Sequence, residues 1–343
     1  GHNTAVGVQA LFTNVAGSYA TAIGVNAMRN ANNTITAFTN TNVAVGFEAL
    51  RGSSTASANT GNNNTAIGYQ TLMNNTTGNR NISFGYASLS SNLTGNDNAA
   101  LGYNALAVAT GSQNTALGSF SMESTTTGQY NTAMGFQSML SNTTGSYNTS
   151  IGRQSLATTT VGNFNTAVGY SAGNGFNNGS NNTFIGYNAD ASAASFTNAM
   201  AVGNGAVVTA SNRVRIGNTA VTQIGGEVGW STLSDGRFKT NIQPSSLGLN
   251  FILRLNPVTY NLTDKGQEGN TYTGLVAQDV EKILQEYNAG FNAVTKPENE
   301  TDRYAIRYAE FVMPLINAVK DQQKQIDELK ALINKMKPNA LLK

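Results

Sequence analysis

A serine, an aspartate and a lysine lie within six residues of one another in the stretch STLSDGRFKTNI, residues 231–242. A serine hydroxyl is a weak nucleophile until a base takes its proton. A lysine can act as that base if burial lowers its pKa toward neutrality, and serine–lysine pairs are a known variant of the serine–histidine arrangement. The only histidine is His2, so Lys239 would have to serve Ser234. The Ser234 hydroxyl adjoins the Leu233 carbonyl, so these residues could attack their own peptide bond, although the spacing alone is weak evidence.

The same stretch separates two regions of different composition. Residues 1–233 contain 6 Arg, no Lys and 5 acidic residues, whereas residues 234–343 contain 27 of the 38 charges and all 5 prolines. Both regions are close to neutral, which argues against a nucleic-acid partner. The absence of Cys excludes disulfides and thiolate metal sites, and we expect no metal and no cofactor. No apolar run is long enough for a membrane span.

The first region repeats with a period of about 17 residues. Blocks such as NTAIG and NTALG end in a glycine, and the steps between these glycines are 17 residues except for two of 22 and one of 16. The glycines are Gly7, Gly24, Gly46, Gly68, Gly85, Gly102, Gly118, Gly135, Gly152, Gly169, Gly186 and Gly203. A fixed period with short alternating strands between Gly and Asn corners predicts a β-solenoid with one repeat per coil.

The alternation also suggests which faces are buried. In NTAIGYQTL, we expect Ile67 to fill the interior of the coil, and the small face with Ala66 and Gly68 to pack against another chain. An asparagine recurs once per coil: Asn64, Asn81, Asn98, Asn114, Asn131, Asn148, Asn165 and Asn182. We favour a ladder of stacked corner amides over a repetitive binding surface.

Units such as TTGQYNTAMGFQSML resemble the head repeats of trimeric autotransporter adhesins, over roughly residues 1–205. The resemblance implies a left-handed parallel β-roll in a homotrimer. The two steps of 22 predict longer loops near Asn33 and Ser57. Residues 206–233 do not follow the 17-residue period, and their pattern predicts a β connector.

The last third has the pattern of a small α+β domain. Residues 245–256 read as a helix that starts near Ser245 or Ser246 and that Pro257 stops. Residues 258–262 read as a strand, residues 271–284 as a strand that leads into a helix near Gln278, and residues 302–308 as a strand.

From about residue 310 to 337 the pattern is that of a coiled-coil helix, with apolar residues alternately four and three apart. Ile and Val at one core position favour dimers in simple models, but we expect a trimer because the stacked coils should dominate. A single amphipathic helix remains the alternative. The seam consists of Leu315, Val319, Gln322, Ile326, Leu329, Ile333 and Met336.

The order SDGRFKTNI, LNPVTYNL, GLVAQDVE and the helical end resembles the C-terminal intramolecular chaperone of phage endosialidases and tail fibres, over residues 234–343. The resemblance implies a domain that helps three chains fold together and then cuts itself off. It makes Ser234 the nucleophile and Lys239 its base, with single-turnover cleavage between Leu233 and Ser234. Asp235, which could hold either Lys239 or the turn, and Gln278 are candidate supporting residues.

These patterns predict a homotrimeric, extracellular fibre that binds a cell-surface receptor, either a glycan or a protein. It would be a tail fibre of a phage or injection system, or a bacterial surface adhesin. A glycan-degrading tailspike and a passive spacer are the alternatives. The five scattered acids of the first region, Glu48, Asp97, Glu123, Asp190 and Glu227, argue against hydrolysis, which needs paired carboxylates.

Overall fold

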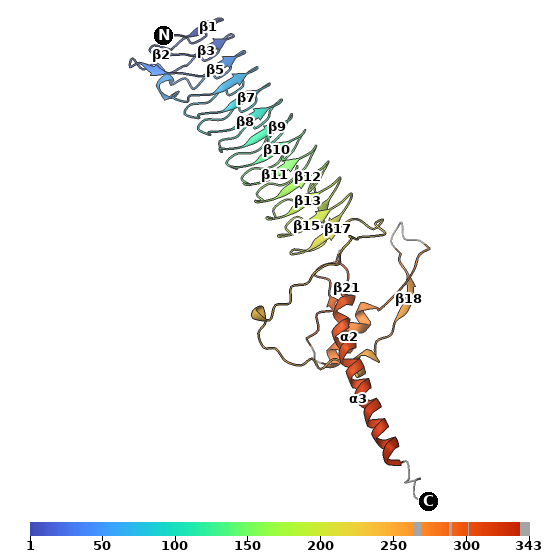
Figure 1. Cartoon of the computed structure of the whole chain (residues 1–343). Coiled ribbons are helices and arrows are strands. Elements are labelled where there is room, and N and C mark those ends of the chain that lie inside the picture. Colours follow the sequence, from blue (N-terminus) through green and yellow to red (C-terminus); the bar gives the residue numbers. More distant parts are fainter. Residues whose placement is uncertain (264–268, 288–289, 301, 337–343) are drawn as a thin grey trace, which may run out of the picture. The chain divides into compact units, whose positions relative to one another are not determined.

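The structure is a computed structural model that describes residues 1–263, 269–287, 290–300 and 302–336. The chain divides into two compact units, Gly1–Asn218 and Thr219–Lys343 (Figure 1). Among the described residues, none of the helices has both the length and the apolarity that a bilayer crossing requires.

The first unit is a β-solenoid, as the sequence predicts, and it is built on one parallel sheet of thirteen strands, one more than the twelve repeat glycines indicate (Figure 1). Each coil contributes one three-residue strand, because Gly at one end and Asn at the other turn the chain after a few residues. Thr65, Ala66 and Ile67 pair with Ile82, Ser83 and Phe84 one repeat later. The strands are β1 Thr4–Val6, β3 Thr21–Ile23, β5 Val43–Val45, β6 Thr65–Ile67, β7 Ile82–Phe84, β8 Ala99–Leu101, β9 Thr115–Leu117, β10 Thr132–Met134, β11 Thr149–Ile151, β12 Thr166–Val168, β13 Thr183–Ile185, β15 Met200–Val202 and β17 Val214–Ile216.

Short elements fill the corners of a few coils. The two longer steps, where longer loops are expected, contain β4 (Phe38–Thr39), which pairs with β2 (Gly17–Ser18), and the 3-10 turn η1 (Ala56–Ala58). Near the last coils, β14 (Asp190–Ala191) pairs with β16 (Val207–Val208). The residues expected to form a β connector therefore divide: β16 and β17 belong to the solenoid, and residues 219–233 contain no strand.

The two faces of the strand are the reverse of the prediction. Ala66 is fully buried inside the coil, whereas Ile67 lies on the outward side and is half-buried. The interior has room for only a small side chain on the strand, because a larger residue from the opposite wall occupies it. Gly68 does allow close approach of another backbone, but that backbone is the next coil of the same chain, at Gly85.

The opposite wall supplies the large side chains of the core. They are Leu72, Leu89, Leu106, Met122, Met139 and Leu156, all fully buried. Each has a φ near +50°, a conformation that is unusual for a bulky residue. The packing of one such side chain per coil against the alanine column offsets this local strain.

The recurring asparagines form the predicted ladder of corner amides. Asn131 Oδ1 accepts a hydrogen bond from the backbone N–H of Asn148 at 3.0 Å, and Asn131 Nδ2 donates to the Gly145 carbonyl at 2.8 Å. Asn64 through Asn182 are all at most 1% exposed. A repetitive polar binding surface at these side chains is therefore excluded.

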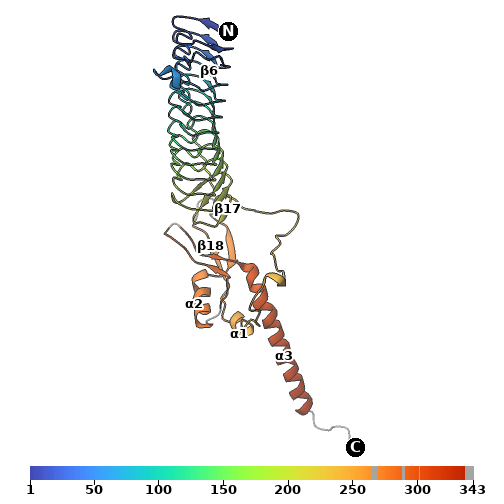
Figure 2. The same cartoon turned by 90° about the vertical axis from the view of Figure 1, so that its left-hand side faces the viewer.

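The second unit is a small α+β domain (Figure 2). Its elements are the 3-10 turn η2 (Gly236–Phe238), α1 (Leu249–Ile252), the antiparallel pair β18 (Val258–Asn261) and β19 (Thr271–Gly274), α2 (Ala277–Tyr287), the antiparallel pair β20 (Val294–Thr295) and β21 (Ala305–Ile306), the 3-10 turn η3 (Tyr308–Phe311), and α3 (Val312–Met336). Phe251, Val280, Leu284 and Phe311 form its core.

Two details of this unit differ from the sequence prediction. The first helix begins at Leu249 with Gly248 as its N-cap, not near Ser245 or Ser246. The Leu249 backbone N–H instead donates to Asp321 Oδ2 of α3 at 3.0 Å, so a carboxylate from another helix does the work of a cap. Residue 337, where the coiled-coil prediction ends, lies outside the described residues.

Candidate functional site

The structure brings Ser234 and Lys239 together. Lys239 Nζ donates a hydrogen bond to Ser234 Oγ at 2.7 Å. The turn η2 lies between them, with hydrogen bonds from Phe238 N–H to the Asp235 carbonyl at 3.2 Å and from Lys239 N–H to the Gly236 carbonyl at 3.1 Å. This turn shortens the path between the two residues, so that a spacing of five places the Ser234 hydroxyl beside the Lys239 amine.

Asp235 holds the turn and makes its ion pair with Arg237. Its Oδ1 accepts the Arg237 backbone N–H at 2.9 Å, which is an N-cap interaction, and its Oδ2 pairs with the guanidinium at 2.6 Å. The hydrogen bonds from Arg237 lower the pKa of the Asp235 carboxyl. Of the two roles considered for Asp235, the geometry supports the fixing of the turn that orients Lys239.

The segment that carries the pair is exposed in the single chain. The side chain of Leu233 is fully exposed, and Trp230 and Phe238 are almost as exposed. Ser234 and Lys239 are exposed as well. The described part of one chain therefore does not enclose the pair.

Gln278 lies apart from this pair. Within the described residues it makes no hydrogen bond to Ser234 or Lys239, and it lines an open cleft of about 600 Å³ near the start of α2. Other residues of this cleft are Tyr260, Leu275, Val276, Tyr304 and Tyr308. No group of three or more His, Cys, Asp or Glu side chains close enough to hold a metal ion occurs among the described residues.

The apolar seam of α3 is exposed in the single chain. Val319, Ile326, Leu329 and Ile333 are 45–64% exposed, and Met336 is 79% exposed. The first half of the helix is anchored to α1 and to the residues just before it, with Asp321 Oδ2 accepting the Leu249 N–H and Asn317 Nδ2 donating to the Leu247 carbonyl, both at 3.0 Å. A row of apolar side chains therefore extends along a helix without a partner in the described part of the chain.

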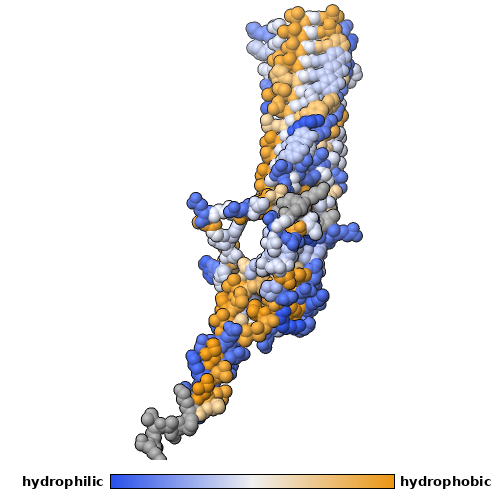
Figure 3. All heavy atoms as spheres, turned by 90° about the vertical axis from the view of Figure 1, so that its right-hand side faces the viewer, coloured by the Kyte–Doolittle hydropathy of each residue, from blue (hydrophilic) through white to orange (hydrophobic). Residues whose placement is uncertain are grey.

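The solenoid carries an outward feature that the sequence reasoning missed. Rings at the position after the repeat glycine stack along the coils, with centroids 4.9 Å apart for both Tyr69–Tyr86 and Tyr86–Tyr103. Figure 3 shows columns of hydrophobic residues that run along this unit. The available signal was the aromatic residue that follows Gly in most repeats. In the coil where Ser119 follows the glycine, the next residue, Phe120, supplies the ring and lies tilted against Tyr103 and edge-on to Phe136. The rings and the guanidinium of this column, the aromatic ladder, are Phe47, Tyr69, Tyr86, Tyr103, Phe120, Phe136, Arg153, Tyr170 and Tyr187.

A solenoid followed by a small domain that opens with a serine–lysine pair fits a tail-fibre-like or tailspike-like protein. Comparison with known families agrees: a family model described as chaperone of endosialidase matches residues 234–288, beginning at Ser234. No curated protein and no solved structure matches the chain. The match covers η2, α1, the pair β18–β19 and α2, but not the solenoid.

Proposed function

We propose that this chain forms a homotrimeric extracellular attachment fibre, and that its last third is an assembly chaperone which cuts itself off. The observation that carries the proposal is the 2.7 Å hydrogen bond between Lys239 and Ser234. It lies at the first residue of the segment that matches the endosialidase chaperone family. The domains would be the solenoid head of residues 1–218, the connector of 219–233 and the chaperone of 234–343.

The cleavage would proceed through an ester. Lys239 in its neutral form takes the proton of the Ser234 hydroxyl, and Oγ attacks the carbonyl carbon of Leu233. The C–N bond between Leu233 and Ser234 breaks as the amine receives the proton, which leaves an ester between Leu233 and the Ser234 side chain. One water molecule hydrolyses this ester to a Leu233 carboxylate and a free serine hydroxyl. The enzyme turns over once and needs no cofactor.

Assembly would switch on this reaction. Because Lys239 and Leu233 are exposed in the single chain, neighbouring chains would have to cover the pair and exclude water from it before the reaction begins. Cleavage would then follow folding of the trimer. In this order, the chaperone domain is released only after the trimer has folded.

A homotrimer is supported by two exposed apolar surfaces. The seam of α3 has the spacing of a coiled coil, and the outward residues of the solenoid strands, such as Ile151 and Ile185, are about 40% exposed. The resemblance to autotransporter heads suggests three parallel chains and a left-handed coil. We favour attachment to a cell-surface glycan or protein, as a tail fibre or a surface adhesin.

The charges of the solenoid support attachment over glycan hydrolysis. Glu48 is paired with Arg51 at 3.1 Å, and Asp97 is paired with Arg80 at 2.6 Å. Glu123 accepts a hydrogen bond from Asn104 at 3.1 Å. Acids engaged in this way on separate coils do not form the pair of carboxylates that a glycosidase requires.

The direct test is the intact mass of the purified full chain under denaturing conditions. We expect a fragment of residues 234–343 with an N-terminal serine. Ser234→Ala should remain uncut, Lys239→Ala should be uncut or greatly slowed even at raised pH, and the control Ser231→Ala should cleave normally. A full-length mass for the unmodified chain in a folded trimer would refute the proposed cleavage.

A further inference from the structure

The outward side of the solenoid is a face four residues wide. In the coil that contains β10, exposed or half-exposed Tyr130, Thr132, Met134 and Phe136 alternate with buried Asn131 and Ala133. Thr132 and Met134 alternate with Ala133 along the strand and therefore share its outward side. Tyr130, with a φ of +58°, and Phe136, which follows Gly135 with a φ of +136°, flank the strand at its two ends and are the edges of this face. The same four positions recur in successive coils with the parallel register of the sheet.

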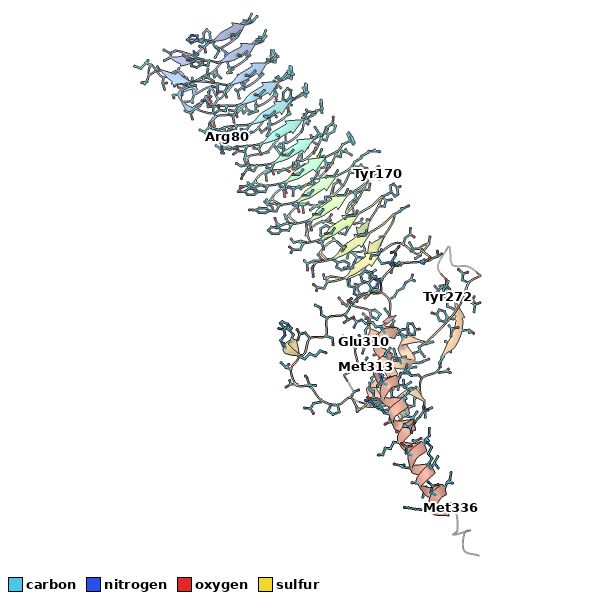
Figure 4. The ribbon with its side chains drawn as sticks, viewed as in Figure 1. Arg80, Tyr170, Tyr272, Glu310, Met313 and Met336 are labelled. Carbon is cyan, nitrogen blue, oxygen red and sulfur yellow. The ribbon has the colours of Figure 1, made fainter. Side chains whose placement is uncertain are left out.

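The two edges of this face differ in chemistry. One edge is the aromatic ladder, which continues through most coils. Figure 4 shows Arg80, from the other edge, and Tyr170, from the ladder, on opposite sides of the strand stack. The edge that carries Arg80 is mostly polar, with Asn63, Asp97 and Gln113 in neighbouring coils.

The polar edge changes character at three coils. Tyr130, Tyr147 and Phe164 stack on each other, with centroids 4.7 and 5.0 Å apart and planes within 8° and 11° of parallel. All three have φ of +57° to +60°, where Asn or Asp would be favoured and a ring is costly. These rings are 44–55% exposed, so contacts within the chain account for only part of their surface.

The same three coils contain the one cation of the ladder. The Arg153 guanidinium lies 5.7 Å from the Phe136 ring centroid and 5.5 Å from the Tyr170 ring centroid. At the four outward positions of the coils, the only charged residues are Arg80, Asp97 and Arg153. Arg80 and Asp97 neutralise each other through two hydrogen bonds, of 2.6 and 2.8 Å, whereas Arg153 has no acidic partner there.

We propose that, in the assembled fibre, the edge of Tyr130, Tyr147 and Phe164 packs against the Phe136–Arg153–Tyr170 stretch of the ladder of the next copy. The proposal rests on the proposed homotrimer and specifies its contact. Parallel chains related by rotation about the fibre axis join unlike edges, so the polar edge of one chain meets the ladder of the next. Arg153 then lies over a ring of the neighbouring chain as well as over its own.

The size and the periodicity of the outward face both favour a second copy of this chain as the partner that covers it. Thirteen strands about 4.8 Å apart, each with about 20 Å of outward chain, give a face on the order of 1,000 Å². A stable interface buries roughly 800 Å² per partner. A partner must also repeat at one strand spacing along the whole face, and another solenoid of the same sequence does so.

The edge chemistry also limits the register between chains. Arg153 meets a ring of the neighbour if the chains are aligned or shifted by one coil. A shift of two coils sets Arg153 against Gln113 or Asn181 instead. The contact therefore excludes larger slips, which the nearly identical strands would otherwise permit.

The chain has no cysteine, so introduced cysteines can report the contact without interference. Gln113→Cys with Ser119→Cys places one thiol on each edge of a single coil without removing a ring of the three-coil cluster. Under mild oxidation or with a short bis-maleimide, this variant should give covalent species of up to three chains on a denaturing gel. The control, Gln113→Cys with Thr127→Cys, has its second thiol outside the face and should remain single chains.

Combining Gln113→Cys with Tyr103→Cys, or with Phe136→Cys, tests whether neighbouring chains are shifted by one coil in either direction. Cross-linking to Ser119 or to one of these two is expected, and cross-linking only at greater offsets would overturn the proposal. The mass of each native variant is measured by light scattering in parallel. If the variants are trimers but do not cross-link between the edges, the proposed contact is wrong while the proposed homotrimer is not affected. If they are monomers, both proposals are wrong.

Discussion

Replacement of Asn131 by alanine tests whether the amide ladder holds the solenoid together. Asn131 is 1% exposed, and its side chain joins three coils through the Gly145 carbonyl, the Asn148 N–H and the Asn114 side chain, at 2.8, 3.0 and 3.1 Å. In Asn131→Ala, the Asn148 N–H loses its partner inside the protein, whereas the Gly145 carbonyl keeps the hydrogen bond from Asn142 Nδ2 at 3.1 Å. One buried unsatisfied group costs about 1–3 kcal/mol, so the expected loss is about 1–3 kcal/mol.

The control is Gln129→Ala in the same coil. Gln129 is exposed, and the hydrogen bonds given for it involve its backbone, with Ser146 and Tyr147. This substitution should change stability by less than about 0.5 kcal/mol.

The assay is guanidinium unfolding followed by far-UV circular dichroism, together with amide hydrogen exchange. Exchange is needed because a stack of repeats can open locally without unfolding as a whole. In Asn131→Ala, the amides of the coils around β10 and β11 should exchange much faster than in the control. Equal midpoints and equal exchange for the two variants would show that the ladder is incidental to stability.

Three further outcomes are expected. A gene that ends at Leu233 should give misfolded or aggregated protein, and soluble trimers from it would show that the last third is not needed for folding. Ile326→Lys should shift the native mass from trimer toward monomer by placing a charge in the seam of α3, whereas Lys324→Gln should not. Burial raises the pKa of Asp190, so its folded state binds a proton more tightly than the unfolded state, whose pKa is about 3.8, and its contribution to stability is lost as pH rises above that value. The stability of the original chain in thermal unfolding should therefore fall as pH rises from about 4 toward neutrality, and Asp190→Asn, which cannot ionise, should lose this dependence. Because Gly175 N–H and Ala191 N–H donate to different carboxylate oxygens, the substitution also removes one acceptor, and the test is the change with pH of the stability difference between the two chains. A difference independent of pH would contradict this origin.

The period of the repeat was sufficient to predict the sheet. A step of 17 residues between glycines fixes which residues pair, and the pairing of Thr132 with Thr149 and of Met134 with Ile151 follows directly. The corner ladder was predictable because Asn is one of the few residues that can turn the chain and also satisfy backbone groups of the next coil.

The orientation of the strand faces was not predictable in the same way. Alternation shows that Ala66 and Ile67 lie on opposite faces, but it does not identify the interior. That choice depends on Leu72, whose φ of +50° turns a large side chain into the coil. A leucine is a poor candidate for this conformation in isolation, so local propensity gives no warning of it.

The proximity of Ser234 and Lys239 was likewise not predictable from the sequence alone. Five residues of loop can hold two side chains at many distances. The contact depends on η2, which Asp235 caps and Arg237 supports. Sequence order identified the residues, and the turn accounts for the 2.7 Å contact between them.

The proposed roles of the two units follow from where the residues that distinguish one coil from another lie. Ser150 and Ser155 share a hydrogen bond of 2.5 Å and Phe184 packs against Phe176, so individual coils differ in their cores. These residues are buried and therefore make no contact with a neighbouring chain. Only the outward face can influence the register between chains, and there most coils carry similar apolar and aromatic residues. The contact of Arg153 on this face disfavours shifts of two or more coils between neighbouring chains, but it does not disfavour a shift of one coil. A separate domain that joins the chains at one end before the coils stack would remove this last ambiguity, and nothing in the finished fibre would then require that domain to stay.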